Sequence, residues 1–180
     1  MNMSTIKDLP RCEKYMSLAL DEAEKAAKQG DVPVGAVLVC QDQVLAAAHN
    51  QRENGGGATA HAEILVIEAA CCKLARWRLS DCELFVTLEP CPMCAGAVLN
   101  ARIGRVVYGS KDPRAGAFGS VMDLNCYPLG HRPDVEGGVL AEKSLALLQD
   151  FFAKSRRKAE CLETKADNGS PKALPVKEKK

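Results

Sequence analysis

The sequence predicts an α/β fold in a single domain. Segments with the composition of β-strands alternate with amphipathic helical segments along most of the chain, which is the pattern of α/β proteins. The 180 residues are enough to bury a substantial core within one domain. The content of 47% apolar and 26% charged residues is that of an ordinary globular protein.

The first sixty residues predict a helix, two strands and a loop. From about Arg11, apolar residues recur at helical spacing through CEKYMSLALDEAEKAAKQG, and Gly30 is a natural stop for that helix. The segments VPVGAVLVC and VLAAAH predict two strands joined by a short polar turn around Asp42. Residues 50–59 include three consecutive glycines and therefore predict a loop.

The next fifty residues predict two helices and two strands. One helix opens at Thr59 or Ala60 and runs to about Lys73. ELFVTLE is rich in β-branched and aromatic residues, which favour a strand. In CPMCAGAVLNA, Pro92 suits the first turn of a new helix, and RVVYG predicts the following strand.

The last part of the chain predicts one irregular segment and one helix. Residues 110–138 are rich in Gly and Pro, whereas VLAEKSLALLQDFFAKSRRK is amphipathic. Beyond about Ala159 the apolar periodicity fades. We therefore expect an N-terminal extension over residues 1–10, a folded domain over 11–158 and a disordered polar tail over 159–180.

The composition favours a cytoplasmic protein. The first residues lack the apolar stretch of a secretory signal, and no segment reaches the ~20 apolar residues of a membrane span. Nine cysteines, an odd number, favour free thiols in a reducing compartment over a disulfide framework. Seven of them are expected to fill space as small hydrophobic residues: Cys12, Cys40, Cys71, Cys72, Cys82, Cys126 and Cys161.

Basic residues gather in two places, although the net charge is only +1. Such clusters can attract a polyanion to a nearly neutral protein, and each would also suit an ordinary solvated surface. The first cluster holds Arg102, Arg105, Lys111 and Arg114, and the second holds Lys154, Arg156, Arg157 and Lys158.

Cys91 and Cys94 are spaced to act together. Three residues apart at the start of a helix, they share one face, and the helix macrodipole there favours thiolate. Taken alone, this pair fits a redox couple, half of a structural metal site or part of a catalytic metal site.

His61 favours the catalytic metal site. A structural zinc site normally has four protein ligands, and the sequence holds no second CxxC pair and no HxxxH pair. His61, Cys91 and Cys94 would leave a fourth position for water. Glu63 could then take a proton from that water and pass it to a leaving group. Because residues two apart diverge within a helix, His61 and Glu63 must lie in its first turn.

HAE (61–63) followed by PCPMC (90–94) resembles the signature of the zinc-dependent deaminases. Residues 87–124, the segment HNQRE and the ending LLQDFFAKSRRK are similar to the bacterial tRNA-specific adenosine deaminases. The resemblance covers roughly residues 11–158. It implies a three-layer α/β/α fold of the cytidine-deaminase type, with a mixed five-stranded sheet between helices, and a homodimer with one zinc ion per subunit. The implied reaction converts adenosine to inosine at the wobble position of a tRNA anticodon stem-loop and releases ammonia.

The same resemblance implies roles for further residues. Asn50 would hold the flipped base, Val34 and Ala62 would contact it, and Asp112 would touch the ribose of the neighbouring nucleotide. Asn50 and Asp112 would equally suit ordinary turns. Three residues of the closing helix would lie along the anticodon loop: Phe151, Phe152 and Arg156. On an amphipathic helix, at most one of two adjacent rings is expected to touch RNA.

Two other functions stay open at the level of the sequence. A deaminase of free bases or nucleosides, such as guanine or cytosine, would share the metal site, but the two basic clusters argue against it. A non-catalytic, zinc-stabilised RNA-binding module would also use the two cysteines. Glu63 and the missing fourth ligand argue against that second function.

Overall fold

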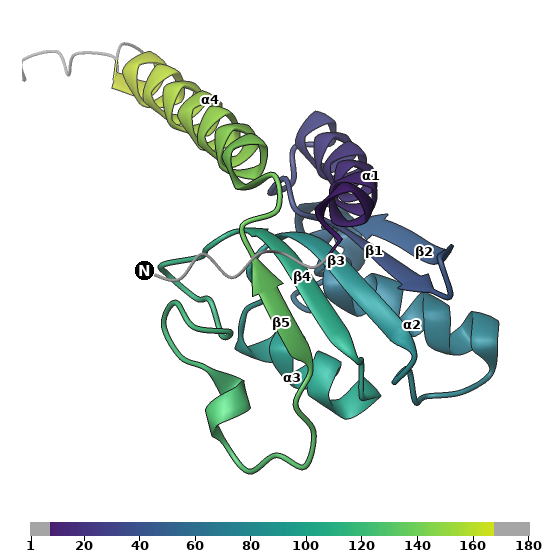
Figure 1. Ribbon diagram of the computed structural model, residues 1–180. Helices are drawn as coiled ribbons and strands as arrows, with labels where there is room; N and C mark the ends of the chain where they lie inside the picture. Colours follow the sequence, from purple (N-terminus) through teal and green to yellow (C-terminus); the bar gives the residue numbers. More distant parts are fainter. Residues whose placement is uncertain (1–7, 168–180) are drawn as a thin grey trace, which may run out of the picture.

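The structure, a computed structural model, describes residues 8–167 of the chain. Five strands, four α-helices and two short helical turns make up the described part (Figure 1). In chain order these are α1 (Leu9–Lys28), β1 (Gly35–Cys40), β2 (Gln43–His49), η1 (Arg52–Gly56), α2 (Ala62–Leu74), β3 (Cys82–Leu88), α3 (Pro92–Ala101), β4 (Arg105–Ser110), η2 (Leu124–Cys126), β5 (Asp134–Gly137) and α4 (Ala141–Asp167).

The five strands form one mixed sheet in the order β2-β1-β3-β4-β5. Strand β1 pairs antiparallel with both β2 and β3, while β3 pairs parallel with β4 and β4 pairs parallel with β5. Four strands therefore run in one direction and β1 alone runs against them. It follows that β2, β3 and β4 end at the edge where β1 begins, which we call the site edge.

Separate apolar cores cover the two faces of the sheet. On one face, α1 contributes Met16 to a cluster that includes Phe85. On the other, α2 and α3 contribute Val66 and Val98 to a cluster that includes Leu84. Helix α4 lies on the side of α1 and contacts both α1 and β4 (Figure 1). The expected three-layer α/β/α arrangement with a mixed five-stranded sheet is confirmed.

Helix α1 approaches the sheet most closely at Gly35, the first residue of β1. A Cβ atom at Gly35 would lie 2.0 Å from the carbonyl oxygen of Ala19 and 2.5 Å from the backbone nitrogen of Ala23. Both alanines are fully buried. Small residues on helix and strand thus set the distance between α1 and the strand that begins at the site edge.

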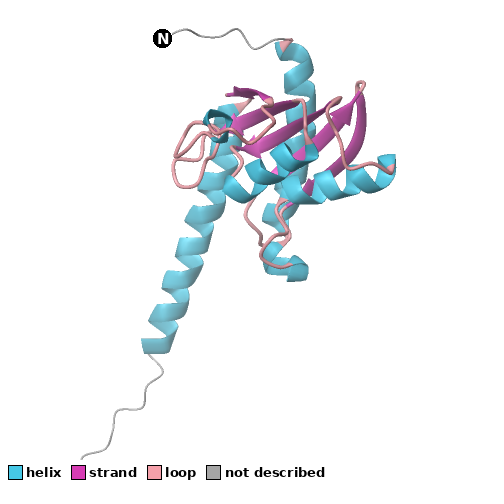
Figure 2. Ribbon diagram, turned by 90° about the horizontal axis from the view of Figure 1, so that it is seen from below, coloured by secondary structure: helices cyan, strands magenta, loops and turns pink. Residues whose placement is uncertain are grey.

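Two expectations about the C-terminal third were wrong. Residues 110–138 are not wholly irregular, because residues 134–137 form β5 and pair with β4. The last helix does not end near residue 158 but continues to Asp167, so its distal part extends away from the sheet (Figure 2). The remainder of the expected tail, residues 168–180, and most of the expected N-terminal extension, residues 1–7, lie outside the described residues.

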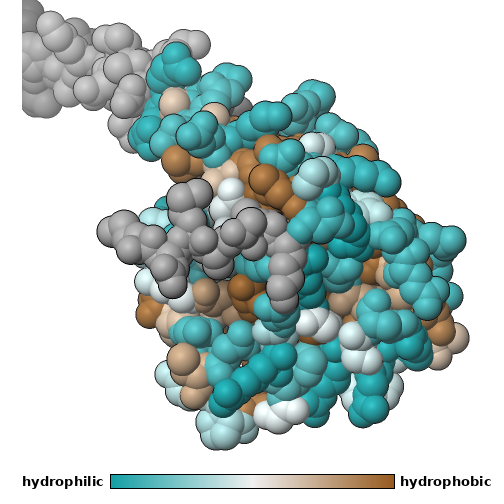
Figure 3. Space-filling model, in the orientation of Figure 1, coloured by the Kyte–Doolittle hydropathy of each residue, from teal (hydrophilic) through white to brown (hydrophobic). Residues whose placement is uncertain are grey.

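None of the described helices combines the length and the hydropathy needed to cross a lipid bilayer. On the face shown in Figure 3, hydrophilic residues cover most of the surface, with brown apolar patches among them near the start of α4.

The close approach at Gly35 predicts a steric cost for any side chain there. We expect Gly35→Ala to lower the free energy of unfolding by about 3 kcal/mol, because helix or strand must move to make room for the methyl group. Gly96→Ala is the matched control, since a Cβ at this helical position of α3 meets nothing within 4 Å. Gly96→Ala should leave the free energy of unfolding unchanged or raise it by up to about 1 kcal/mol. Chemical denaturation measures the free energy of unfolding of both variants. An equal decrease in the two would contradict the packing argument.

Candidate functional site

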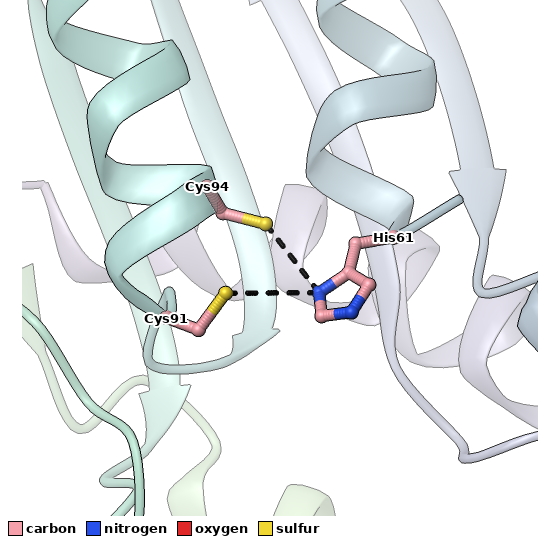
Figure 4. Close-up of side chains that lie close together, drawn as sticks. All are labelled: His61, Cys91 and Cys94. Atoms are coloured by element: carbon pink, nitrogen blue, oxygen red, sulfur yellow. Dashed lines mark hydrogen bonds between the residues drawn. The ribbon is translucent and has the colours of Figure 1, made fainter. Parts of the chain in front are cut away.

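The start of α2 and the start of α3 meet at the site edge. His61 is the N-cap residue of α2, and Cys91 is the N-cap residue of α3, with Cys94 one turn further on. Their side chains point toward one another across the gap between the two helix ends (Figure 4). Three residues from two separate segments of the chain therefore face one small volume, as the sequence predicted.

Local chemistry explains why both helices begin where they do. The Ala62 amide donates a 3.0 Å hydrogen bond to Oδ1 of Asn50, which satisfies one of the unpaired N–H groups at the start of α2. In α3, Pro92 occupies the first turn, where no backbone N–H is needed. The amide of Ala95 donates to the carbonyl of Cys91 at 2.8 Å and closes the first helical bond.

The three side chains have the spacing of metal ligands. His61 Nδ1 lies 3.8 Å from Sγ of Cys91 and 3.5 Å from Sγ of Cys94. A tetrahedral zinc ion with its usual bonds to nitrogen and sulfur would separate these atoms by about 3.6 Å. One histidine and two cysteines that share such a site are a donor set that zinc favours. The residues present therefore fit a tetrahedral metal ion.

Only one of the three donors, Cys91, is held in the deprotonated form that a metal ion binds. A hydrogen bond from the Cys94 thiol, supported by His61, lowers the pKa of Cys91 to about 4. The same contact and burial raise the pKa of the Cys94 thiol. The contact with Cys91 also raises the pKa of His61. A divalent cation would displace the protons of Cys94 and His61, because metal ligands bind in their deprotonated forms.

Glu63 lies beside the donors in the first turn of α2, as the sequence required. Its side chain is only 3% exposed, and Oε2 has no hydrogen-bond partner among the described residues. Burial raises the pKa of the Glu63 carboxyl, and this carboxyl contributes in turn to the raised pKa of Cys94. A buried carboxyl with a raised pKa and an unpaired oxygen is suited to accepting and returning a proton.

A second group of possible metal donors lies at the opposite edge of the sheet. Cys40 and Cys82 are cross-strand neighbours on β1 and β3, and Asp81 lies within reach of both thiols. However, both carboxylate oxygens of Asp81 accept hydrogen bonds from Arg76. The carboxylate of this second group is therefore already paired with a guanidinium.

A groove of about 640 Å³ opens at the site edge. Its walls include Leu88 and Ser110, the last residues of β3 and β4, together with the loop 111–115 and one side of α4. Four basic side chains line it: Arg52, Lys111, Arg114 and Arg156. Arg52 belongs to η1, which lies between β2 and His61 in the chain, and its positive charge opposes the rise in the pKa of His61.

Most of the residues that the sequence predicted to contact RNA fall into two groups in the structure, one lining the groove and one buried. Asp112, Phe152 and Arg156 line the groove. Phe151 does not line it, and its ring packs edge-on against that of Phe152, so one ring of the pair faces the groove. Three other predicted contacts are buried at the start of β1, the end of β2 and the start of α2: Val34, Asn50 and Ala62.

Two residues of the first basic cluster form contacts within the protein. Arg105 forms ion pairs with Glu83 and Glu136, and Arg102 donates to the carbonyl of Gly130. Arg105 was therefore wrongly counted as evidence for a polyanionic partner, because strand pairing brings acidic partners to it. Only Lys111 and Arg114 of that cluster line the groove.

Sequence reasoning missed three residues that shape this region. Val32 and Arg52 line the groove, and Glu89 accepts four hydrogen bonds from the loop that forms one of its walls. A charged residue at the end of an apolar strand, two residues before the CxxC pair, was the available signal for Glu89.

Comparison with known proteins gives a consistent result. The model of the MafB19-like deaminase family matches residues 11–156. A curated tRNA-specific adenosine deaminase of Bacillus subtilis is 48% identical over 147 residues, which cover 81% of this chain and 91% of that protein. A solved structure from studies of A-to-I editing by tRNA:A34 deaminases at the wobble position is similar with a TM-score of 0.73 and 44% identity, covering 75% of this chain and 99% of the other. A guanine deaminase of Bacillus subtilis is similar with a TM-score of 0.53 and 34% identity, covering 62% and 66%.

The geometry of the donors predicts where metal is held. Cys94→Ser should lower bound zinc from about one ion per chain to nearly none, because a hydroxyl is a poor zinc ligand. Cys40→Ser makes the same chemical change in the second group of donors and should leave the metal content unchanged. Elemental analysis of the purified variants measures both. If only Cys40→Ser lost its metal, the ion would be bound at the edge of the sheet opposite the site edge, and its assignment to His61, Cys91 and Cys94 would be wrong.

Proposed function

The chain belongs to the MafB19-like deaminases and to the tRNA-specific adenosine deaminases, and we propose that it converts the wobble adenosine of a tRNA anticodon to inosine. The reaction consumes one water and releases one ammonia. The observation that carries this function is the set of His61, Cys91 and Cys94 beside the buried Glu63, on the same edge of the sheet as a groove lined by basic residues.

We propose that His61, Cys91 and Cys94 hold one zinc ion per chain. The distances among the three donors and their chemistry support this choice. Zinc bound there would act as a Lewis acid that lowers the pKa of a water molecule.

Glu63 is proposed as the residue that moves protons. Its unpaired Oε2 can accept a proton from the attacking water, and the same carboxyl can later deliver a proton to the departing 6-amino group. Because burial raises its pKa, Glu63 can hold that proton between the two transfers. Glu63 is not a metal ligand in this assignment.

The proposed substrate contacts follow from the two parts of the site. Asn50 would hold the base, with Val34 and Ala62 next to it, because all three are buried at the site edge. Asp112, Phe152 and Arg156 would bind neighbouring nucleotides, because they line the groove. Phe151 would act indirectly, through its ring contact with Phe152. Basic residues that hold phosphates and a ring that can stack on a base are the usual means of binding a single-stranded RNA loop.

A deaminase of free bases is the second candidate, since a guanine deaminase shares the fold. A free base could use the metal donors and Glu63, but it would not need the groove. The basic lining of the groove and the position of α4 along it favour an RNA substrate. A non-catalytic RNA-binding module is disfavoured, because it would gain nothing from burying a carboxyl group with an unpaired oxygen at Glu63.

A homodimer and a cytoplasmic location remain predictions. The dimer has support in an apolar hollow on the outer side of α2 and α3, which includes Ile64, Trp77 and Ala97. Trp77 is 59% exposed, which is unusual for so large an apolar side chain on the surface of a monomer.

The proposed substrate predicts a clear preference. The full-length, zinc-loaded protein should form inosine in an anticodon stem-loop with adenosine at the wobble position. It should leave the same stem-loop unchanged when that adenosine is moved by one nucleotide. Free adenosine, guanine and cytosine should react at least about 100-fold more slowly in kcat/KM, because they cannot occupy the groove. Ammonia release from free bases alone would refute the proposed function.

The proposed role of Glu63 predicts loss of chemistry without loss of the site. Glu63→Gln should lower kcat on the stem-loop by about 100-fold to 10,000-fold while the zinc content and the melting temperature stay close to those of the parent. Glu24→Gln makes the same change on an exposed part of α1 and should leave turnover unaffected. Single-turnover measurement of inosine tests both variants. Full activity of Glu63→Gln would mean that another group moves the proton.

A further inference from the structure

Glu89 is a buried acid between the metal-binding turn and the groove. It follows β3 directly and stands two residues before Cys91. Its side chain is 2% exposed, and no ion pair of the described residues includes it. A buried carboxylate without a cation must be stabilised by hydrogen bonds.

All of the side-chain hydrogen bonds of Glu89 come from a single segment, residues 112–120. Oε1 accepts from the amides of Phe118 at 3.0 Å and Ser120 at 3.1 Å. Oε2 accepts from the amide of Asp112 at 3.2 Å and from the hydroxyl of Ser120 in a short contact. One carboxylate thus joins both ends of this segment.

The segment is wrapped closely around the carboxylate. A Cβ atom at Gly116 would lie between 2.4 and 2.6 Å from the carboxylate atoms of Glu89, so no larger residue fits there without a shift. The amide of Ala117 also donates to the carbonyl of Pro90 at 2.9 Å. The segment is therefore attached to the chain immediately before the metal-binding cysteine at both side-chain and backbone level.

The start of the same segment forms a wall of the groove. Asp112 and Arg114 both line it, and Oδ1 of Asp112 accepts a 2.9 Å hydrogen bond from the amide of Arg114. The carboxylate of Glu89 holds the backbone on which these two side chains stand. The position of the Glu89 carboxylate relative to the metal donors is in turn fixed by the short link from Glu89 to Cys91.

We propose that Glu89 is a positioning residue for the RNA substrate. Its carboxylate holds residues 112–120 so that Asp112 and Arg114 face the nucleotides beside the reacting base. The proposal rests on the tRNA function proposed above. Because these side chains face flanking nucleotides and not the reacting carbon, loss of the carboxylate should weaken binding more than chemistry, and KM should rise while kcat changes little.

The test compares two glutamates of the same strand region with an active stem-loop as substrate. Glu89→Gln should raise KM about tenfold or more, because an amide cannot accept all four hydrogen bonds. Its kcat should change by less than about threefold, and its zinc content should be that of the parent. Glu83→Gln is the control, because Glu83 lies at the other end of β3 and pairs with Arg11 and Arg105. It should destabilise the fold without raising KM.

Ser120→Ala is a milder variant that keeps the charge and removes one hydrogen bond to Oε2. It should raise KM by about threefold. In an Asp112→Ala background, Glu89→Gln should raise KM by a smaller factor than in the parent, because one of the two residues through which Glu89 acts is already lost.

The outcomes separate the two proposals. A parent protein that does not deaminate the stem-loop would refute the proposed function. With an active parent, either of two results would overturn the role of Glu89 alone. In the first, Glu89→Gln and Ser120→Ala leave KM unchanged. In the second, the effects of Glu89→Gln and Asp112→Ala on KM simply multiply. If Glu89→Gln does not fold, Ser120→Ala decides the question.

Discussion

The direction of β1 is the constraint on which the site depends. Because β1 runs against the other four strands, the ends of β2, β3 and β4 and the beginning of β1 share one edge of the sheet. Asn50, Cys91 and Asp112 each follow one of those three strand ends, and they meet there although they are far apart in sequence. Two helices also begin at this edge, so the positive ends of their dipoles face the same volume and stabilise thiolate in it.

The ends of α2 and α3 are built so that the ligands need not serve the helices. His61 and Cys91 are both N-cap residues, yet neither uses its side chain as a cap. In α2 that task falls to Asn50, whose oxygen accepts the hydrogen bond of the Ala62 amide. The imidazole and the thiols are therefore left to interact with one another and with a metal ion.

The features that the sequence predicted correctly are local ones. The spacing of Cys91 and Cys94 lies within one helical turn, and the position of His61 and Glu63 follows from the geometry of a helix start. Strand β5 was missed because it has only four residues, two of them Asp134 and Glu136, and its pairing with β4 is not encoded by an apolar pattern.

The features that the sequence left hidden depend on contacts between distant segments. Arg105 was counted with the basic cluster, but its acidic partners stand 22 and 31 residues away on other strands. The partners of Glu89 lie 23 to 31 residues downstream. Charge patterns along a chain do not reveal which of these groups neutralise or hold one another, since that is decided by strand order.

The hydrogen bond between the Ala62 amide and Asn50 also fixes the polarity of the Asn50 side chain before any base arrives. The hydrogen bond of 3.0 Å uses one of the two lone pairs of Oδ1 and leaves Nδ2, which can only donate, outside the helix start. A ligand group that met Nδ2 would have to offer a lone pair at that point. The need to begin α2 thus decides which end of the Asn50 side chain accepts a hydrogen bond and which end donates one.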